Sequence, residues 1–295
     1  MNENYVEKKY YFNFRTIPKT HIDKLHNAFQ LSFANYHVNI NTSLAALKDR
    51  MARIGIDLSI SVAAYNEAKI IGFIIQAGDT LNGEKTAYNG GTGVIPLYRR
   101  KHISTELYTF AFPILKEKGF KQCILEVIQE NEPAIKTYKR LGFCTTRKLL
   151  CYKTEKKINL PPAQISLTLH IIKNKLPDWK LYETFYDFIP TWQNSTASVL
   201  RNFDNETIIE AFHQAKVVGF VIFESLSGKI SQLAVDRSYR RQGIGSQLLR
   251  TVASFSRVPR LSVLNVDENT SGMSNFLIRA GFKEVITQEE MIKLL

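Results

Sequence analysis

A basic loop with two glycines carries the clearest chemical signal in this sequence. It reads YRRQGIG over residues 239–245, between a stretch typical of a strand and one typical of an amphipathic helix. The start of a helix offers unpaired backbone N–H groups and a partial positive charge. Three arginines nevertheless crowd just before it: Arg237, Arg240 and Arg241. They make sense there if a polyanion lies among them. Gly243 and Gly245 let the backbone approach phosphate oxygens, and Ser246 offers a hydroxyl donor. The loop therefore predicts a phosphate-binding site.

The chain contains this pattern twice. Residues 94–108 match residues 235–249, and residues 125–143 match residues 264–282. The two matches occur in the same order and at nearly the same separation, and the period is far longer than that of a solenoid. We therefore expect two copies of one domain.

The boundary between the copies should lie near the middle of the chain. A charge run followed by Pro161 and Pro162 resists both helix and central strand, which predicts a linker over 153–162. The expected domains are residues 1–155 and 163–295.

Hydrophobic periodicity predicts the same order of elements in each half. In the second half we expect strands over 164–172, 207–214, 217–225, 229–235 and 260–266, and helices over 178–189, 196–202, from Gly243 onward and over 271–280. The first half should have strands over 10–17, 60–66 and 69–78 and helices within 21–54. The helix after each loop should bury one apolar face, made of Ile103, Leu107, Phe110 and Ile114 in the first half and of Ile244, Leu248, Val252 and Phe255 in the second.

The loop and its surroundings resemble the GNAT superfamily of acetyltransferases, whose pyrophosphate loop reads Q/R-x-x-G-x-G/A. Residues 240–245 match that pattern fully, and the resemblance covers nearly the whole chain, once in each half. It implies an α/β fold of two tandem GNAT domains. Each would have a mixed, mostly antiparallel twisted sheet flanked by helices, with a V-shaped split between the central strands.

The resemblance also implies acetyl-CoA as the cofactor. In the second half its pantetheine would lie against the backbone of 233–235 and its pyrophosphate on 241–246. The residues expected to bind it are Leu233, Ala234, Val235, Arg240, Arg241, Gln242, Gly243, Ile244, Gly245, Ser246 and Asn269.

The first half departs from the family pattern. Its loop reads YRRKHIS over 98–104, with His102 and Ser104 where glycines are expected. Histidine tolerates positive φ better than most side chains, and serine is small and can donate to phosphate. We therefore expect weaker cofactor binding here, through Val94, Arg99, Arg100, Lys101, His102, Ile103, Ser104 and Asn131.

Acetyl transfer to an amine needs a neutral amine and a donor for the oxyanion, and an acid helps the departing thiolate. Many GNAT members carry this acid as the Tyr of N-x-x-A-x-x-x-Y-x-x-x-G-F, a pattern intact over residues 131–143. Tyr138 is therefore the candidate acid. Glu126 alternates with Leu125 and Val127 on the preceding strand, so it should face the open surface of the sheet as the candidate base.

The second half lacks these groups. Leu277 stands at the position of Tyr138, Asn265 at that of Glu126, and Thr270 at that of Asn131. The better phosphate loop and the better acid thus lie in different halves. We favour catalysis in the first half; the alternatives are a second-half site without a Tyr acid, or one active site assisted by a domain that holds cofactor structurally.

The acceptor pocket in this family comes from the first two helices and their loop. In the first half that region holds Phe33, Asn35, Tyr36 and His37, and in the second half it holds Tyr182, Phe185, Tyr186, Asp187 and Trp192. Asp187 could attract an ammonium, and the aromatic side chains could cover an apolar stem or a cation.

Composition narrows the class of protein. The chain is 44% hydrophobic and 22% charged, and no apolar run reaches the roughly 18–20 residues of a membrane span. The first residues lack the apolar stretch of a signal peptide, so we expect a cytoplasmic protein without membrane partners. Three cysteines without a CxxC pair and six scattered histidines predict neither a disulfide framework nor a metal site.

The sequence therefore predicts an acetyl-CoA-dependent N-acetyltransferase that acts on a primary amine, of a small molecule or a protein, by direct attack in a ternary complex. One alternative is a regulatory protein that binds acetyl-CoA without turnover. A net charge of +12 suggests nucleic-acid binding as another. We disfavour that alternative because the basic residues cluster at the two loops and no RNA- or DNA-binding motif is present. The sequence leaves the acceptor and the oligomeric state undetermined.

Overall fold

The computed structural model describes residues 12–34, 42–81, 83–160, 163–172 and 177–295. The chain forms two compact units. Unit 1 holds the described residues up to Leu125, together with Lys136–Phe143 and Ile292–Leu295. Unit 2 holds Glu126–Ile135 and Cys144–Met291.

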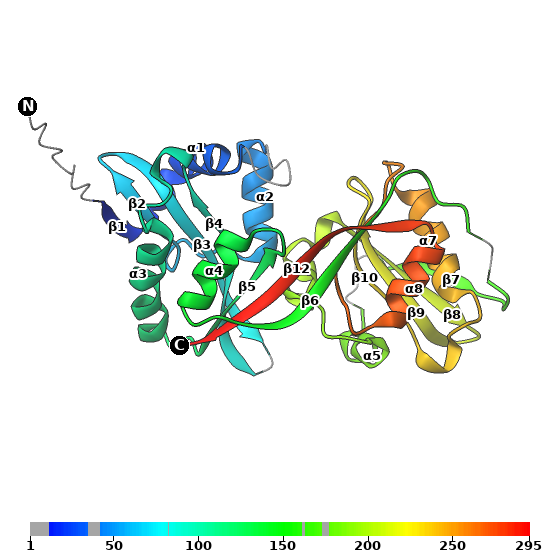
Figure 1. The fold of residues 1–295 in the computed structure, drawn as a ribbon. Helices are drawn as coiled ribbons and strands as arrows, with labels where there is room; N and C mark the ends of the chain where they lie inside the picture. The colour runs from blue at the N-terminus through cyan, green and yellow to red at the C-terminus, as the bar shows by residue number, and fades with distance from the viewer. Residues whose placement is uncertain (1–11, 35–41, 82, 161–162, 173–176) are drawn as a thin grey trace, which may run out of the picture. The chain divides into compact units, whose positions relative to one another are not determined.

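Unit 1 is built on a sheet in the order β1-β2-β3-β4-β5 (Figure 1). Its strands are β1 (Asn13–Thr16), β2 (Val62–Asn66), β3 (Lys69–Leu81), β4 (Glu84–Val94) and β5 (Gln122–Ile128). Its helices are α1 (Ile22–Phe33), α2 (Leu44–Ile54), α3 (Ile103–Glu117) and the end of α4 (Glu132–Arg140), with short 3-10 turns at Lys19–His21 and Pro96–Tyr98. The parallel pairing of β4 with β5 covers Thr86–Asn89, so the last residues of β4 lie beyond the paired part.

Unit 2 repeats this plan. Its sheet runs in the order β12-β6-β11-β10-β9-β8-β7. The strands are β6 (Cys144–Thr154), β7 (Thr168–Ile172), β8 (Glu206–His213), β9 (Lys216–Glu224), β10 (Lys229–Val235), β11 (Ser262–Asp267) and β12 (Phe282–Leu294). The helices are α5 (Trp179–Phe185), α6 (Thr196–Arg201), α7 (Ile244–Phe255) and α8 (Ser271–Arg279), with 3-10 turns at Trp192–Asn194, Phe203–Asn205 and Arg237–Tyr239. Parallel pairing of β10 with β11 covers only Lys229–Ile230, so the central strands separate there.

Helices cover both faces of each sheet. Neighbouring residues of a strand point to opposite faces, so two adjacent residues that contact different helices show this. In unit 1, Phe73 packs with α1 residues, whereas a Cβ on Gly72 would meet Ile103 of α3 at 2.8 Å. In unit 2, Phe220 stacks on Tyr182 of α5, whereas a Cβ on Gly219 would meet Ile244 of α7 at 3.2 Å. The predicted fold class, two mixed sheets flanked by helices with a split between central strands, is confirmed.

The compact units do not coincide with the expected contiguous domains 1–155 and 163–295, because each unit contains segments from both halves of the sequence. Strand β6 follows α4 in the first half of the sequence, yet it pairs with β11 in unit 2. Tyr152 is buried in the core of unit 2 and Leu150 packs against that core. This hydrophobic packing stabilises β6 in unit 2. At the other end of the chain, the Leu295 backbone N–H donates to the Lys121 carbonyl within unit 1.

Several element boundaries differ from the sequence expectations. Helix α5 ends at Phe185, not at residue 189, because Tyr186 is already extended. Phe110 and Phe255 are exposed, and the buried faces of their helices run instead through Tyr108 and Ala111, and through Leu249 and Ala253. The strands begin at Asn13 and Thr168, later than expected.

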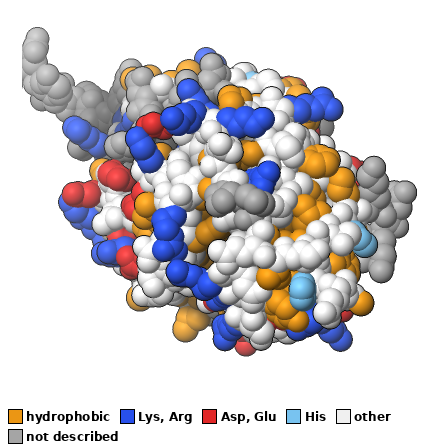
Figure 2. Space-filling model, turned by 90° about the vertical axis from the view of Figure 1, so that its right-hand side faces the viewer, with side chains coloured by type: hydrophobic (Ala, Val, Ile, Leu, Met, Phe, Trp, Pro, Cys, Tyr) orange, Lys and Arg blue, Asp and Glu red, His pale blue; other side chains and the backbone are white. Residues whose placement is uncertain are grey.

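On the face shown in Figure 2, lysine and arginine side chains lie at many separate places among polar and hydrophobic ones. In the part of the chain that the structure describes, no helix is both long and apolar enough to cross a membrane.

Candidate cofactor and active site

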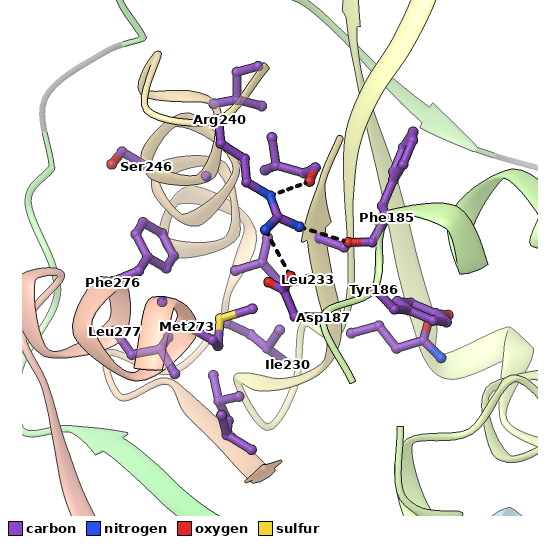
Figure 3. Close-up of a pocket in the computed structure, with 18 of the residues that line it drawn as sticks. Phe185, Tyr186, Asp187, Ile230, Leu233, Arg240, Ser246, Met273, Phe276 and Leu277 are labelled. Atoms are coloured by element: carbon purple, nitrogen blue, oxygen red, sulfur yellow. Dashed lines mark hydrogen bonds and ion pairs between the residues drawn. The ribbon is translucent and has the colours of Figure 1, made fainter. Parts of the chain in front are cut away.

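A cavity of about 870 Å³ opens in unit 2 where β10 and β11 separate (Figure 3). Its walls come from both strands, from the start of α7, from α8 and from the segment after α5. The predicted residues that line it are Leu233, Ala234, Val235, Arg240, Arg241, Gly243, Ile244, Gly245 and Ser246. Gln242 and Asn269 do not line it. The Asn269 side chain instead donates to Asp267 at 3.1 Å.

The backbone at the start of α7 is arranged to leave donors available. Gly243 is the N-cap in the left-handed region at φ 84°, and Arg241 is also left-handed at φ 66°. No side chain caps this helix, and the Gln247 N–H is the one that returns to the Gly243 carbonyl. The N–H groups of the first turn have no intrahelical partner, so they can bind an anion that enters the cavity.

The Arg240 guanidinium is held by hydrogen bonds to three other residues of the protein. Its guanidinium donates to the Val235 carbonyl at 3.0 Å, to the Phe185 carbonyl at 3.1 Å and to Asp187 at 2.8 Å. It thus ties the end of β10 and the segment after α5 to the loop. The expected attraction of an ammonium by Asp187 is corrected, because Arg240 already neutralises that carboxylate.

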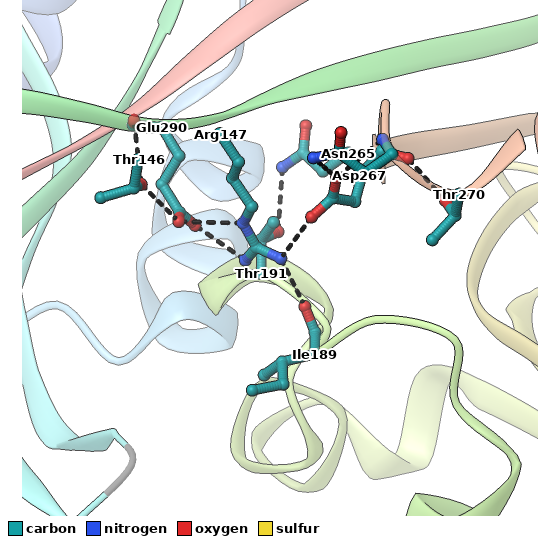
Figure 4. A network of polar contacts seen from close by, with 9 residues as sticks. Thr146, Arg147, Ile189, Thr191, Asn265, Asp267, Thr270 and Glu290 are labelled. Carbon is teal, nitrogen blue, oxygen red and sulfur yellow. Dashed lines mark hydrogen bonds and ion pairs between the residues drawn. The ribbon is translucent and has the colours of Figure 1, made fainter.

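A second polar cluster fixes the segment 189–194, which helps to form the cavity (Figure 4). Arg147 of β6 binds both carboxylate oxygens of Glu290 at 2.9 Å, and donates to the Ile189 carbonyl at 2.9 Å. The same guanidinium lies 3.5 Å from Asp267. Asn265 donates to Thr191 at 3.0 Å. Sequence reasoning missed this cluster, because its members lie on segments that the sequence assigns to different halves.

Comparison with known proteins decides the family. The model of the acetyltransferase (GNAT) family matches residues 25–143 and 176–282. The chain belongs to the GNAT family. A curated relative, N-alpha-acetyltransferase 30 of Schizosaccharomyces pombe, is 31% identical over 97 residues, which are 31% of this chain and 62% of that protein. The match therefore spans less than two thirds of the relative.

Solved GNAT structures share the fold over nearly the whole chain. A GCN5-related N-acetyltransferase from Sphaerobacter thermophilus has a TM-score of 0.73 at 15% identity, covering 96% of this chain and 95% of its own. A tandem GNAT protein from the clavulanic acid biosynthesis pathway has a TM-score of 0.69 at 15% identity, covering 96% and 98%. The tandem arrangement of two GNAT domains is confirmed.

The first GNAT loop has the same backbone as the second. Arg100 and His102 adopt φ values of 62° and 56°, which match those of Arg241 and Gly243 in kind. Arg99 repeats the bracing of Arg240, since it donates to the Val94 carbonyl at 3.2 Å and to the Ser32 carbonyl at 2.9 Å. Cofactor binding by this loop, with Lys101, Ile103 and Ser104, stays a prediction, as does the role of Asn131, whose side chain accepts from the Ala134 N–H at the start of α4.

The two candidate catalytic residues lie in different compact units. Tyr138 is 8% exposed in unit 1, where its ring lies edge-on to Tyr108 and Phe143. Glu126 lies in unit 2, where it accepts a hydrogen bond from Gln193. Burial raises the pKa of Glu126, against the effect of hydrogen bonds with Gln193, Thr191 and Asn265. Glu126 supports the segment 189–194 and does not line the cavity. The acid and base roles stay predictions.

In the second GNAT domain Leu277 lines the cavity at the position of the family tyrosine. Tyr186 also lines the cavity, but its hydroxyl donates to Gln232 at 2.7 Å. Burial raises the pKa of Tyr186 well above its ordinary value, so this phenol keeps its proton. A thiolate is a competent leaving group near neutral pH even without a donor, because thiol pKa values lie near 8.5.

The remaining acceptor-pocket candidates divide between core and cavity. Tyr182 stacks on Phe220 at 3.6 Å and Trp192 is 3% exposed, so both belong to the core and not to a pocket. Phe33 packs against Phe29 and Phe73. Asn35, Tyr36 and His37 lie outside the described residues. Within the described residues, no three His, Cys, Asp or Glu side chains group together as metal ligands.

Proposed function

We propose that this protein is an acetyl-CoA-dependent N-acetyltransferase and that the cavity of unit 2 holds the cofactor. The observation that carries the proposal is the continuity of the cavity, from the uncapped start of α7 along Leu233–Val235 to the point where β10 and β11 separate. An elongated ligand with a polyanionic end and an uncharged arm fits such a site.

The residues present fit acetyl-CoA. Arg241 and Gly243 have left-handed backbone and line the cavity, and the N–H groups in the first turn of the helix that follows would hold the pyrophosphate. A Cβ on Gly245 would lie 3.1 Å from the Phe276 ring, so a side chain there would press on this wall of the cavity. The backbone of Leu233–Val235, on a strand edge without a β11 partner, would hold the pantetheine amides. When bound, acetyl-CoA supplies the acetyl group as a thioester, whose transfer to an amine forms a C–N bond and releases coenzyme A as a thiol.

We place the transfer in unit 2, and not in the first half that the sequence led us to favour, because the cavity described here is lined by unit 2 residues. Direct attack by the amine fits the lining of this cavity. No cysteine, histidine or lysine is among its described lining residues, so no strong protein nucleophile is placed to carry the acetyl group. The protein would orient the amine, exclude water and hold the cofactor. These contributions lower the barrier mainly through proximity.

The proposal is tested with the full chain, acetyl-CoA and three amines: a short peptide with a free α-amine, glucosamine and n-butylamine. The peptide comes first because the curated relative is named an N-alpha-acetyltransferase. We expect an acetylated product by mass spectrometry with at least one amine. This readout avoids thiol dyes, which would also label the exposed Cys144. Acetyl-CoA binding without turnover on any amine would contradict the proposal and support a regulatory protein.

A further inference from the structure

Asn194 sits at the point where the central strands of unit 2 separate. The last paired residues are Ile230 on β10 and Val263 on β11. Just beyond them, the Asn194 side-chain amide donates to the Leu264 carbonyl at 2.8 Å. The Gln232 side chain donates to the Asn194 carbonyl at 2.7 Å. Asn194 therefore bridges the two strands at the closed end of the split, and it lines the cavity.

One atom of Asn194 is buried without a partner. The residue is only 5% exposed, and among the described residues its Oδ1 has no hydrogen-bond partner. The assignment of Oδ1 and Nδ2 is fixed by chemistry, because only the nitrogen can donate to the Leu264 carbonyl. A buried carbonyl oxygen of this kind costs free energy until a donor reaches it.

The neighbouring polar groups already make hydrogen bonds to other partners. The Tyr186 hydroxyl donates to Gln232, and the Gln232 amide nitrogen donates to the Asn194 backbone. Neither is therefore in place to satisfy Oδ1. Because Asn194 lines the cavity, an N–H or O–H donor of a ligand that enters there could supply the missing hydrogen bond.

The position along the cavity indicates which donor this is. The phosphate end of the cofactor would lie at the start of α7, which comes after β10 in the chain, and the pantetheine would run back along Val235, Ala234 and Leu233. Gln232 and Asn194 come next in that direction, at the end where the acetyl group would lie. This is the place that the incoming amine must reach.

We propose that Oδ1 of Asn194 accepts a hydrogen bond from the acceptor amine and so orients the nitrogen lone pair toward the acetyl carbonyl. A neutral primary amine has two N–H bonds, so it can donate one to Oδ1 while its lone pair remains free for attack. The inference rests on the proposed function and extends it to the recognition of the acceptor.

The test compares two variants of the full chain. Asn194→Asp keeps an acceptor oxygen and loses the donor to Leu264, whereas Asn194→Leu loses both. With the amine among the three probes that wild type acetylates, we expect KM for the amine to rise at least about tenfold in Asn194→Leu and less than about threefold in Asn194→Asp. Calorimetric titration of that amine into protein saturated with coenzyme A, where no turnover occurs, should show the same order of affinities. The acetyl-CoA Kd should change less than about threefold in both variants.

Three outcomes would overturn the inference. Equal losses in both variants would show that the bond to Leu264 matters, not the oxygen. Unchanged amine affinity in both would remove the amine from this site. A tenfold weaker acetyl-CoA Kd in Asn194→Leu alone would assign the N–H to pantetheine. Failure of wild type to acetylate any of the three amines would instead overturn the proposed function itself.

Discussion

At the scale of single residues, the motif located the two loop arginines, Arg240 and Arg99, but did not predict their contacts within the protein. The sequence identifies Arg240 and Arg99 as matching positions, and the structure gives them matching contacts to the carbonyls of Val235 and Val94. Their other partners, at Phe185 and Ser32, lie more than fifty residues away in sequence. No local pattern reports such partners, so the sequence could not distinguish a phosphate ligand from a brace.

We expect Arg240→Lys to destabilise the protein before any ligand is added. A lysine keeps the charge but cannot donate to three separate acceptors in the geometry of a guanidinium. The carbonyls of Val235 and Phe185 would lose their donor, so the free energy of unfolding should fall by about 1–3 kcal/mol in denaturant titrations. Unchanged unfolding together with weaker acetyl-CoA binding would show that Arg240 contacts the cofactor directly.

The loop backbone was more predictable than the side chains. His102 was expected to tolerate positive φ, and its φ of 56° is confirmed. That expectation rests on local sterics, which depend on one residue type and its neighbours. No such signal marked Asn194 in the sequence. Its side-chain oxygen is a candidate ligand group only because the folded structure buries it without a hydrogen-bond partner among the described residues.

At the scale of elements, periodicity predicted most helices and strands but not which compact unit each of them joins. The helix after each loop, the strand β11 and the helix α8 follow the prediction, because alternation and helical spacing are local properties. The strands β6 and β12, which follow the last helix of each half, were not predicted. The pairing of β6 with β11 joins residues more than one hundred positions apart in the sequence, and no local pattern reports such a pairing. For the same reason the sequence did not place Glu126 and Arg147 beside the segment 189–194.

We expect Arg147 of β6 to be important for the second GNAT domain although it belongs to the first half of the sequence. Arg147→Leu removes the partner of Glu290 and Asp267, whose side chains are each only 14% exposed. Unfolding free energy should fall by about 3 kcal/mol, and acetyl-CoA should bind more weakly because the segment 189–194 loses an anchor.

The adjacent residue provides a matched control for this strand. Lys148 pairs with Glu268 at 3.9 Å, and its side chain is 44% exposed. Lys148→Leu should therefore change the unfolding free energy by less than about 1 kcal/mol. Similar losses in the two variants would mean that any substitution in β6 disturbs the sheet, and that the Arg147 cluster has no special role.

At the scale of the whole molecule, the repeat predicted two domains of one fold, and the family match in two regions confirms the repeat. The units do not follow the sequence halves, however, since each contains segments from both. A fragment that begins after residue 160 would lack β6, so ligand binding should be measured on the full chain. The net charge of +12 fits a cofactor with phosphates, and on the face shown in Figure 2 the lysine and arginine side chains lie at separate places.

The central claim is that the start of α7 in unit 2 holds the phosphates of acetyl-CoA, and calorimetry on two matched variants tests it most directly. Ser246 and Thr105 are each the third residue of the helix after a loop, and both are half-buried. An aspartate at such a position suits a helix N-terminus but opposes a bound polyanion. Ser246→Asp should weaken acetyl-CoA binding in unit 2 at least about tenfold, whereas Thr105→Asp should leave that binding unchanged. Wild-type affinity and stoichiometry in Ser246→Asp would contradict the account.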